Sequence, residues 1–137
     1  GYVYSLQYHL VWCTKCRKPV LVNGLDEECK KMLQELAEEY QFGILAMEVM
    51  PDHSHLLVDC KPQFFISDMI KIMKGNLARQ MFLSHPELKQ ELWGGHLWNP
   101  SYCAVTVSDR SREQVLAYIE GQKEKETNKN RNLKNQN

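Results

Sequence analysis

The sequence predicts an α+β fold of the ferredoxin-like type, an antiparallel sheet with helices on one face. The first observation behind this prediction is the order of the periodic segments, which runs strand, helix, strand, strand, helix, strand, helix without a repeat or a linker. The second is the length of 137 residues, which suits one domain. The third is a hydrophobic content of 43%, which is enough for a single core.

The first half of the chain supplies three of these strands and one helix. Residues 2–14 are rich in aromatic and β-branched side chains, a composition typical of a long strand. Apolar residues recur at helical spacing over residues 29–40. Residues 44–50 and 53–60 are short apolar runs separated by a Pro-Asp pair, which predicts a hairpin.

The second half supplies two helices, a strand and a polar end. An apolar stripe over residues 66–83 predicts the second helix, and residues 102–107 have β-forming side chains. Ser111 begins a capping-box pattern, so the last helix should start there. We expect one domain over residues 1–124 and a basic, polar and flexible tail over residues 125–137.

Charge and cysteine content narrow the function classes. The 17 Lys and Arg residues balance 17 Asp and Glu residues, which argues against a protein that coats nucleic acid without discrimination. No apolar run reaches the roughly 18 residues of a membrane span, and the first residues lack the features of a signal peptide. We therefore expect a soluble, cytoplasmic protein whose 5 cysteines, an odd number, are reduced thiols.

Two pairs of polar residues are candidates for chemistry. His53 and His55 lie two apart in a predicted strand, so their side chains leave the same face and could reach one metal ion. Taken alone, such a pair is as compatible with structural or surface histidines as with metal ligands. Tyr118 and Gln122 are four apart on the last predicted helix, so a phenol and an amide should point the same way, about 6 Å apart.

Three motifs together resemble a known family. They are MPDHSHLLV at residues 50–58, LWGGHLWNPSY at residues 92–102 and YIEGQ at residues 118–122. In order and spacing they are similar to the HUH-type single-tyrosine transposases of the IS200-like family, small transposases of insertion sequences that move as single-stranded DNA. The similarity covers residues 1–124 and implies a ferredoxin-like fold of the HUH endonuclease type with the tyrosine on the C-terminal helix.

The resemblance implies a metal-assisted active site. Family members hold one divalent cation, Mg²⁺ or Mn²⁺, with two histidines and a glutamine, which here correspond to His53, His55 and Gln122. Neutral ligands leave the charge of such an ion almost undiminished, so that it polarises the scissile phosphate. Tyr118 would be the nucleophile and would form a 5′-phosphotyrosine. Because that bond retains the phosphodiester energy, strands would be rejoined without ATP or another nucleotide cofactor.

The resemblance also implies the partners of the chain. These are single-stranded DNA with subterminal hairpins and a second copy of the chain, in a homodimer whose active sites combine residues of both subunits. The candidate DNA-binding residues are Lys71, Lys74 and Arg79 of the second helix and Lys15, Arg17 and Lys18 of the loop after the first strand. An exposed aromatic side chain could stack a splayed base, but the sequence does not identify which one. Bound to DNA, the protein would lie at the nucleoid of a prokaryotic cell.

Three residues near these motifs carry further expectations. The family has a bulky hydrophobic residue between its histidines, where this chain has Ser54, whose side chain should point to the opposite face and weaken packing there. Gly121 lies inside the last predicted helix and would ease its movement, because glycine costs a helix about 1 kcal/mol relative to alanine. Asp52 should hydrogen-bond the turn, with a contact to a ligand histidine as the alternative.

Three other interpretations stay open from the sequence. One is a domesticated relative that processes repetitive hairpins for its host. Another is a hairpin-binding regulator without activity, in which Ser54 and Gly121 are marks of decay. The third is a zinc hydrolase that uses the histidine pair, although it would lack a clear third His, Asp or Glu ligand and would give Tyr118 no task.

Overall fold

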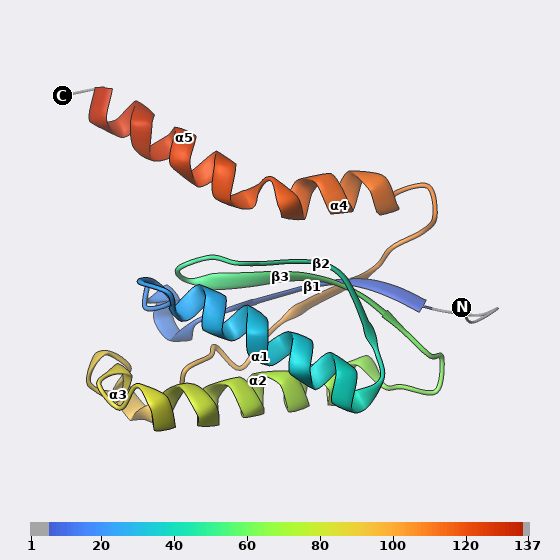
Figure 1. Ribbon diagram of the computed structural model, residues 1–137, viewed down its shortest axis with the longest axis horizontal. Coiled ribbons are helices and arrows are strands. Elements are labelled where there is room, and N and C mark those ends of the chain that lie inside the picture. The colour runs from blue at the N-terminus through green and yellow to red at the C-terminus, as the bar shows by residue number, and fades with distance from the viewer. Residues whose placement is uncertain (1–5, 136–137) are drawn as a thin grey trace.

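The computed structural model describes residues 6–135 and shows a four-stranded antiparallel sheet with the strand order β2-β3-β1-β4 (Figure 1). The strands are β1 (Leu6–Cys13), β2 (Gly43–Val49), β3 (His53–Cys60) and β4 (Cys103–Thr106). The long helices are α1 (Leu25–Tyr40), α2 (Ile66–Ser84), α4 (Arg112–Glu120) and α5 (Gln122–Asn135). This architecture confirms the predicted α+β fold of ferredoxin-like type.

Helices cover both faces of the sheet, so the prediction of helices on one face only is wrong. α1 and α2 lie on one face, and α4 lies across the other, over β2 and β3 (Figure 1). The buried residues of β3 explain why both faces are covered. Leu56 and Val58 pack in the core beneath α1 and α2, and Leu57 packs with Ile119 of α4 on the other face. Successive buried residues are typical of a strand that is covered on both faces.

The main core lies between the sheet and the pair α1 and α2. Leu10 and Trp12 of β1 meet Leu33 of α1 and Met73 and Leu77 of α2, and all five are fully buried or nearly so. Each such side chain contributes about 1.5–3 kcal/mol when it is buried. This layer therefore supplies most of the buried apolar contacts that stabilise the fold. The side chains on the opposite face of the sheet are not part of this core.

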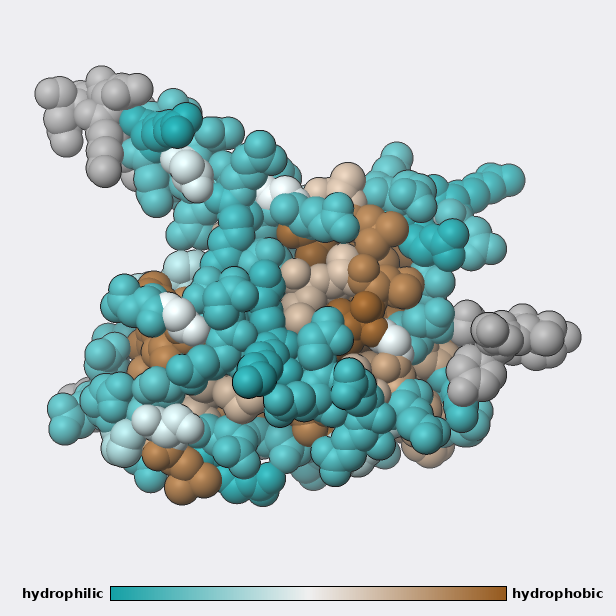
Figure 2. Space-filling view, viewed as in Figure 1, coloured by the Kyte–Doolittle hydropathy of each residue, from teal (hydrophilic) through white to brown (hydrophobic). Residues whose placement is uncertain are grey.

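The layer between the sheet and α4 is smaller. Its buried members are Ala46, Leu57 and Ile119, with Val107, Val115 and Leu116 packed around them. Figure 2 shows apolar residues gathered over β2 between α1 and α4, and Leu45 of this edge strand is exposed. α4 is thus attached by few apolar contacts and is the more easily displaced of the helices that cover the sheet.

Local structure differs from the sequence analysis in the connections. The loops contain three short turns, η1 (Lys15–Arg17), α3 (Leu88–Glu91) and η2 (Trp93–Gly95), which are too short to show a periodicity. Ser111 precedes α4 as expected but makes no capping bond, because its hydroxyl lies 3.1 Å from that of Ser108. The predicted hairpin of β2 and β3 is present.

Residues 122–135 form α5, so residues 125–135 of the segment predicted to be a flexible tail have a helical backbone, and residues 136–137 lie outside the described residues. Most of its described side chains after Gln122 are exposed. Its lysine, glutamate and glutamine residues have a high helix propensity, so a helix can form here although the segment has no apolar face. The domain boundary at residue 124 stays a prediction. Within residues 6–135, no helix is both long and apolar enough to span a bilayer.

Candidate active site

The two histidines of β3 lie together on the face of the sheet that α4 covers. Alternation along β3 turns His53, His55 and Leu57 to this face and turns Ser54 and Leu56 to the other. The ring centroids of His53 and His55 are 4.9 Å apart, with the rings edge to face. The structure therefore places the predicted pair within reach of one common ion.

His9 of β1 joins the pair from the neighbouring strand. Its Nε2 lies 3.1 Å from Nδ1 of His55, and the two rings stack with centroids 5.3 Å apart. Burial, together with the nearby His53, His9 and Lys125, lowers the pKa of His55 to about 4, and burial lowers the pKa of His9. Both rings are neutral at pH 7. When His55 donates from Nδ1 to His9, its Nε2 keeps the lone pair that a metal needs.

A carboxylate orients His53. The Nδ1 of His53 lies 2.7 Å from Oδ1 of Asp52, and Nε of Arg17 donates to Oδ2 at 3.1 Å. Partial burial would raise the pKa of Asp52, but the hydrogen bonds from His53 and Arg17 outweigh it and lower that pKa. The charged carboxylate keeps the proton of His53 on Nδ1 and leaves Nε2 free.

Of the two roles considered for the Asp52 side chain, the structure supports the contact with the histidine. The backbone oxygen of Asp52 accepts a hydrogen bond from the N–H of Thr14 at 2.9 Å, which ties the β2–β3 turn to the end of β1. Its side chain meanwhile contacts His53. Arg17, expected in a strand-binding groove, is thereby placed beside the histidine pair.

Tyr118 of α4 meets the histidines of its own chain. Its ring centroid lies 5.4 Å from that of His55 and 6.0 Å from that of His9, in both cases edge to face. The side chain is 44% exposed, so the phenol stays open to a ligand. The Nζ of Lys125, which is not among the predicted site residues, lies 4.5 Å from the Tyr118 ring centroid. The arrangement places a phenol beside a positive charge that attracts phosphate.

Gln122 follows Tyr118 by one turn, and the helix bends between them. α4 ends at Glu120 and α5 begins at Gln122, with Gly121 at the bend (Figure 1). Gln122 is only 8% exposed, and its Nε2 donates to the backbone oxygen of Tyr118 at 3.0 Å. Its Oε1 is therefore the atom that this amide can offer to a metal.

The start of α5 is held to the body of the protein by charge. Nζ of Lys123 lies 2.7 Å from Oδ2 of Asp26 on α1 and 3.9 Å from Oε1 of Glu48 on β2. Lys123 directly follows Gln122, so these ion pairs hold the chain close to α1 and β2 just after the helix that carries Tyr118.

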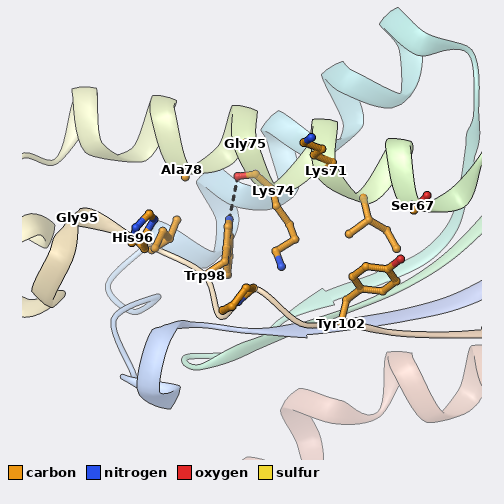
Figure 3. Close-up of a pocket in the computed structure, with 12 residues that line it drawn as sticks. Ser67, Lys71, Lys74, Gly75, Ala78, Gly95, His96, Trp98 and Tyr102 are labelled. Carbon is orange, nitrogen blue, oxygen red and sulfur yellow. Dashed lines mark hydrogen bonds between the residues drawn. The ribbon is translucent and has the colours of Figure 1, made fainter.

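The six candidate DNA-binding residues do not form one surface. Lys71 and Lys74 of α2 line a groove whose other wall is the segment 95–102 (Figure 3). Lys15 lines an adjoining hollow together with Lys74. Arg17 pairs with Asp52.

The remaining two candidates are on the surface. Arg79 is exposed and donates to Oδ1 of Asn76 at 2.7 Å, and Lys18 is exposed. Neither is among the residues that line the groove. No contact of either residue identifies it as a DNA ligand, so their roles stay predictions.

The described side chains fit a metal site with one amide ligand. Residues 6–135 contain no group of three or more His, Cys, Asp or Glu that could hold a metal ion. A zinc hydrolase needs three such protein ligands and an open position for water, and these residues do not supply the three ligands. Two imidazoles whose Nδ1 atoms are occupied fit a cation with open positions for substrate. Gln122 is buried one turn from Tyr118, but its side chain bonds to the backbone oxygen of Tyr118, and no described contact joins it to either histidine.

Comparison with known proteins decides the family. Residues 2–122 match the family described as transposase, IS200 like. The chain belongs to the IS200-like transposase family. Over 126 residues it is 51% identical to the ISDra2 transposase TnpA of Deinococcus radiodurans, which covers 92% of this chain and 90% of that protein. Over 123 residues it is 24% identical to the transposase for insertion sequence element IS200 of Salmonella typhimurium, covering 90% and 80%.

Solved structures agree with this assignment. A crystal structure of a Deinococcus radiodurans R1 protein, described as a transposase, has a TM-score of 0.73 at 50% identity and covers 89% of this chain and 94% of that chain. A REP-associated tyrosine transposase bound to a REP hairpin has a TM-score of 0.67 at 14% identity, covering 92% and 71%. At that identity the second likeness concerns the fold. Membership of this IS200-like family implies cleavage and transfer of DNA strands.

Proposed function

We propose that this IS200-like transposase cleaves and rejoins single-stranded DNA at hairpin-marked ends through a 5′-phosphotyrosine on Tyr118. The observation that carries the proposal is the meeting of Tyr118 with His55, whose ring centroids are 5.4 Å apart although 63 positions separate them in the chain. A half-exposed tyrosine beside two neutral imidazoles suits a phosphate that arrives from solvent.

The transfer step is assigned to Tyr118. Its Oη attacks the scissile phosphorus in line with the leaving oxygen, the bond from phosphorus to O3′ breaks, and the phenol loses its proton while the 3′-oxygen gains one. The product is a tyrosyl ester of the 5′-phosphate and a free 3′-hydroxyl. Attack by another 3′-hydroxyl reverses the step and joins a new strand. No external energy source is required, because a phosphodiester is exchanged for another one.

His53, His55 and Gln122 are proposed to hold the cation. When bound, Mg²⁺ or Mn²⁺ would polarise a non-bridging oxygen of the phosphate and neutralise the charge that develops on it. Asp52 holds His53 in the tautomer that presents Nε2, and His55 presents its Nε2 in the same way when its Nδ1 donates to His9. Lys125 adds a positive charge beside the tyrosine ring, where the strand must pass.

The proposed partners are single-stranded DNA with hairpins and a second copy of the chain. Homologous chemistry on a hairpin is suggested by the REP-associated tyrosine transposase, which is seen bound to one. A homodimer is supported by the apolar surface over the edge strand β2, where Leu45 is 41% exposed (Figure 2). The small contact layer of α4 would allow this helix to dock on the partner, so that sites are shared between subunits.

The test is a labelled single strand that carries a hairpin and unpaired flanks, incubated with the protein and Mn²⁺ or Mg²⁺. A label on the 3′ end should appear in an adduct that survives denaturation, whereas a label on the 5′ end should appear in a free, shortened strand. Tyr118→Phe should abolish the adduct, and Tyr40→Phe, at another exposed tyrosine, should not. Binding without an adduct would support a regulator, and cleavage without one a hydrolase; either result contradicts the proposal.

A further inference from the structure

A groove lies between α2 and the segment 95–102 (Figure 3). α2 covers the face of the sheet opposite to α4, the helix that carries Tyr118 (Figure 1). Its cavity volume is about 490 Å³, within the range of about 300–1000 Å³ typical of sites for small ligands. Ile70, Trp98 and Tyr102 give it apolar walls, and Lys71 and Lys74 give it positive charge. No carboxylate is among the residues that line it. The groove therefore suits a ligand with an anionic part and a flat apolar part.

Gly75, in the middle of α2, keeps this groove open. Glycine disfavours a helix interior, so its presence in a 19-residue helix needs a reason. Packing within the described chain is not that reason, because no heavy atom lies within 4 Å of the position that a Cβ would take. The open space lies on the groove wall and lets a ligand approach the helix backbone closely.

Lys74 and Tyr102 are presented to the same space. The Nζ of Lys74 donates to the backbone oxygens of Asn99 at 2.7 Å and Ser101 at 3.3 Å, which holds the amine between Trp98 and Tyr102 (Figure 3). Nε1 of Trp98 donates to the backbone oxygen of Lys74 at 3.0 Å and fixes the distance between the two walls. Tyr102 is 43% exposed and is thus available for stacking.

We propose that this groove holds one unpaired nucleotide of the DNA strand, with its phosphate on Lys71 and Lys74, its sugar next to Gly75 and its base against Tyr102. The inference rests on the proposed function, which supplies the single strand. A base stacked on an aromatic ring with a lysine on its phosphate is the usual means of binding a splayed nucleotide.

The position of the groove also fits a strand that reaches the active site. Lys15 lines the hollow that adjoins the groove, and Arg17, two residues later in η1, pairs with Asp52 beside His53. A strand that leaves the groove along η1 thus meets positive charge on its way to the histidines. The groove would fix the strand upstream or downstream of the scissile phosphate.

The test compares binding of a fluorescent strand, with a hairpin and unpaired flanks, by the wild type, Gly75→Leu and Gly75→Ala. Gly75→Leu fills the groove without removing a charge. It should weaken binding of the strand about tenfold, which is the effect of losing one stacked base. Gly75→Ala adds a smaller side chain and should weaken binding less. Gln80→Leu, exposed on the same helix outside the groove, is the matched control. Thermal unfolding of each variant checks that the fold is kept. A strand that carries 5-iododeoxyuridine in one flank should cross-link to the peptide of Tyr102.

The outcomes separate this inference from the proposed function. Loss of affinity in Gly75→Leu together with a cross-link at Tyr102 supports the nucleotide site. If the wild type forms the covalent adduct, but Gly75→Leu binds as well as Gln80→Leu, the site is refuted and the proposed function stands. Equal loss of affinity for a blunt hairpin without flanks would also refute it, because the ligand would then be duplex. If the wild type neither binds a strand nor forms an adduct, both fail.

Discussion

Replacement of Ser54 by alanine should stabilise the protein. Ser54 has no exposed surface, and its Oγ has no hydrogen-bond partner in the described structure. It lies opposite Trp12 of β1 and Val49 of β2, on the face of β3 away from the histidines. A buried hydroxyl without a partner costs about 1–3 kcal/mol, and alanine removes it without adding volume. We therefore expect the free energy of unfolding to rise by about 1–3 kcal/mol.

Urea unfolding followed by tryptophan fluorescence measures this change directly. The midpoint should move to higher urea at an unchanged slope, and the melting temperature should rise by about 4 °C for each kcal/mol. Ser84→Ala, at an exposed serine of α2, should change stability by less than about 0.5 kcal/mol. The rate of adduct formation should not change, because Ser54 does not face the site. A Ser54→Ala protein that is less stable than the wild type would refute the reasoning.

Three further predictions concern the site and the helix of Tyr118. Asp52→Asn should weaken Mn²⁺ binding about 10–100-fold in calorimetry, because His53 loses its charged partner; unchanged affinity would exclude this orienting role. Lys123→Ala should speed hydrogen exchange in α4 and α5 while lowering the free energy of unfolding by less than about 1 kcal/mol, because the ion pair with Asp26 is half-exposed; equal exchange rates would show that the pair does not hold the helix. A mixture of Tyr118→Phe and His53→Ala proteins should recover some cleavage when sites are shared between subunits, and no recovery would assign each site to one chain.

The strand pattern of β3 made much of the site predictable. A spacing of two residues places His53 and His55 on one face and Ser54 on the other, as the structure shows. The same strand also carries a signal for the helix α4. Residues 56–58 are three successive apolar residues, which indicates cover on both faces and hence a helix on the histidine side.

Contacts that depend on register or on loop packing could not be predicted. The meeting of His9 with His55 depends on how β1 and β3 are paired, which one sequence does not state. The pairing of Arg17 with Asp52 depends on the three-residue turn η1, which has no periodicity. Likewise, the groove at Gly75 exists only because α2 and the segment 95–102 pack across from one another.

Helix propensity and hydrophobicity point in different directions for α5. Its lysine, glutamate and glutamine residues favour a helix although its asparagines do not, while its low hydrophobicity favours a disordered tail. The two criteria conflict wherever a helix has no apolar face. Among residues 122–132 of α5, whose burial the structure describes, only Gln122 at the first position is buried.

The mass of the tryptic peptide that contains Tyr118, taken from protein incubated with strand and Mn²⁺ and then digested with nuclease, tests the account most directly. Nucleophilic attack by Tyr118 predicts that this peptide carries a nucleotide joined through its 5′-phosphate, and that no other peptide does. A nucleotide on a different residue, or cleaved strand with every peptide unmodified, would contradict the central claim that the tyrosine beside the histidine pair makes the covalent bond.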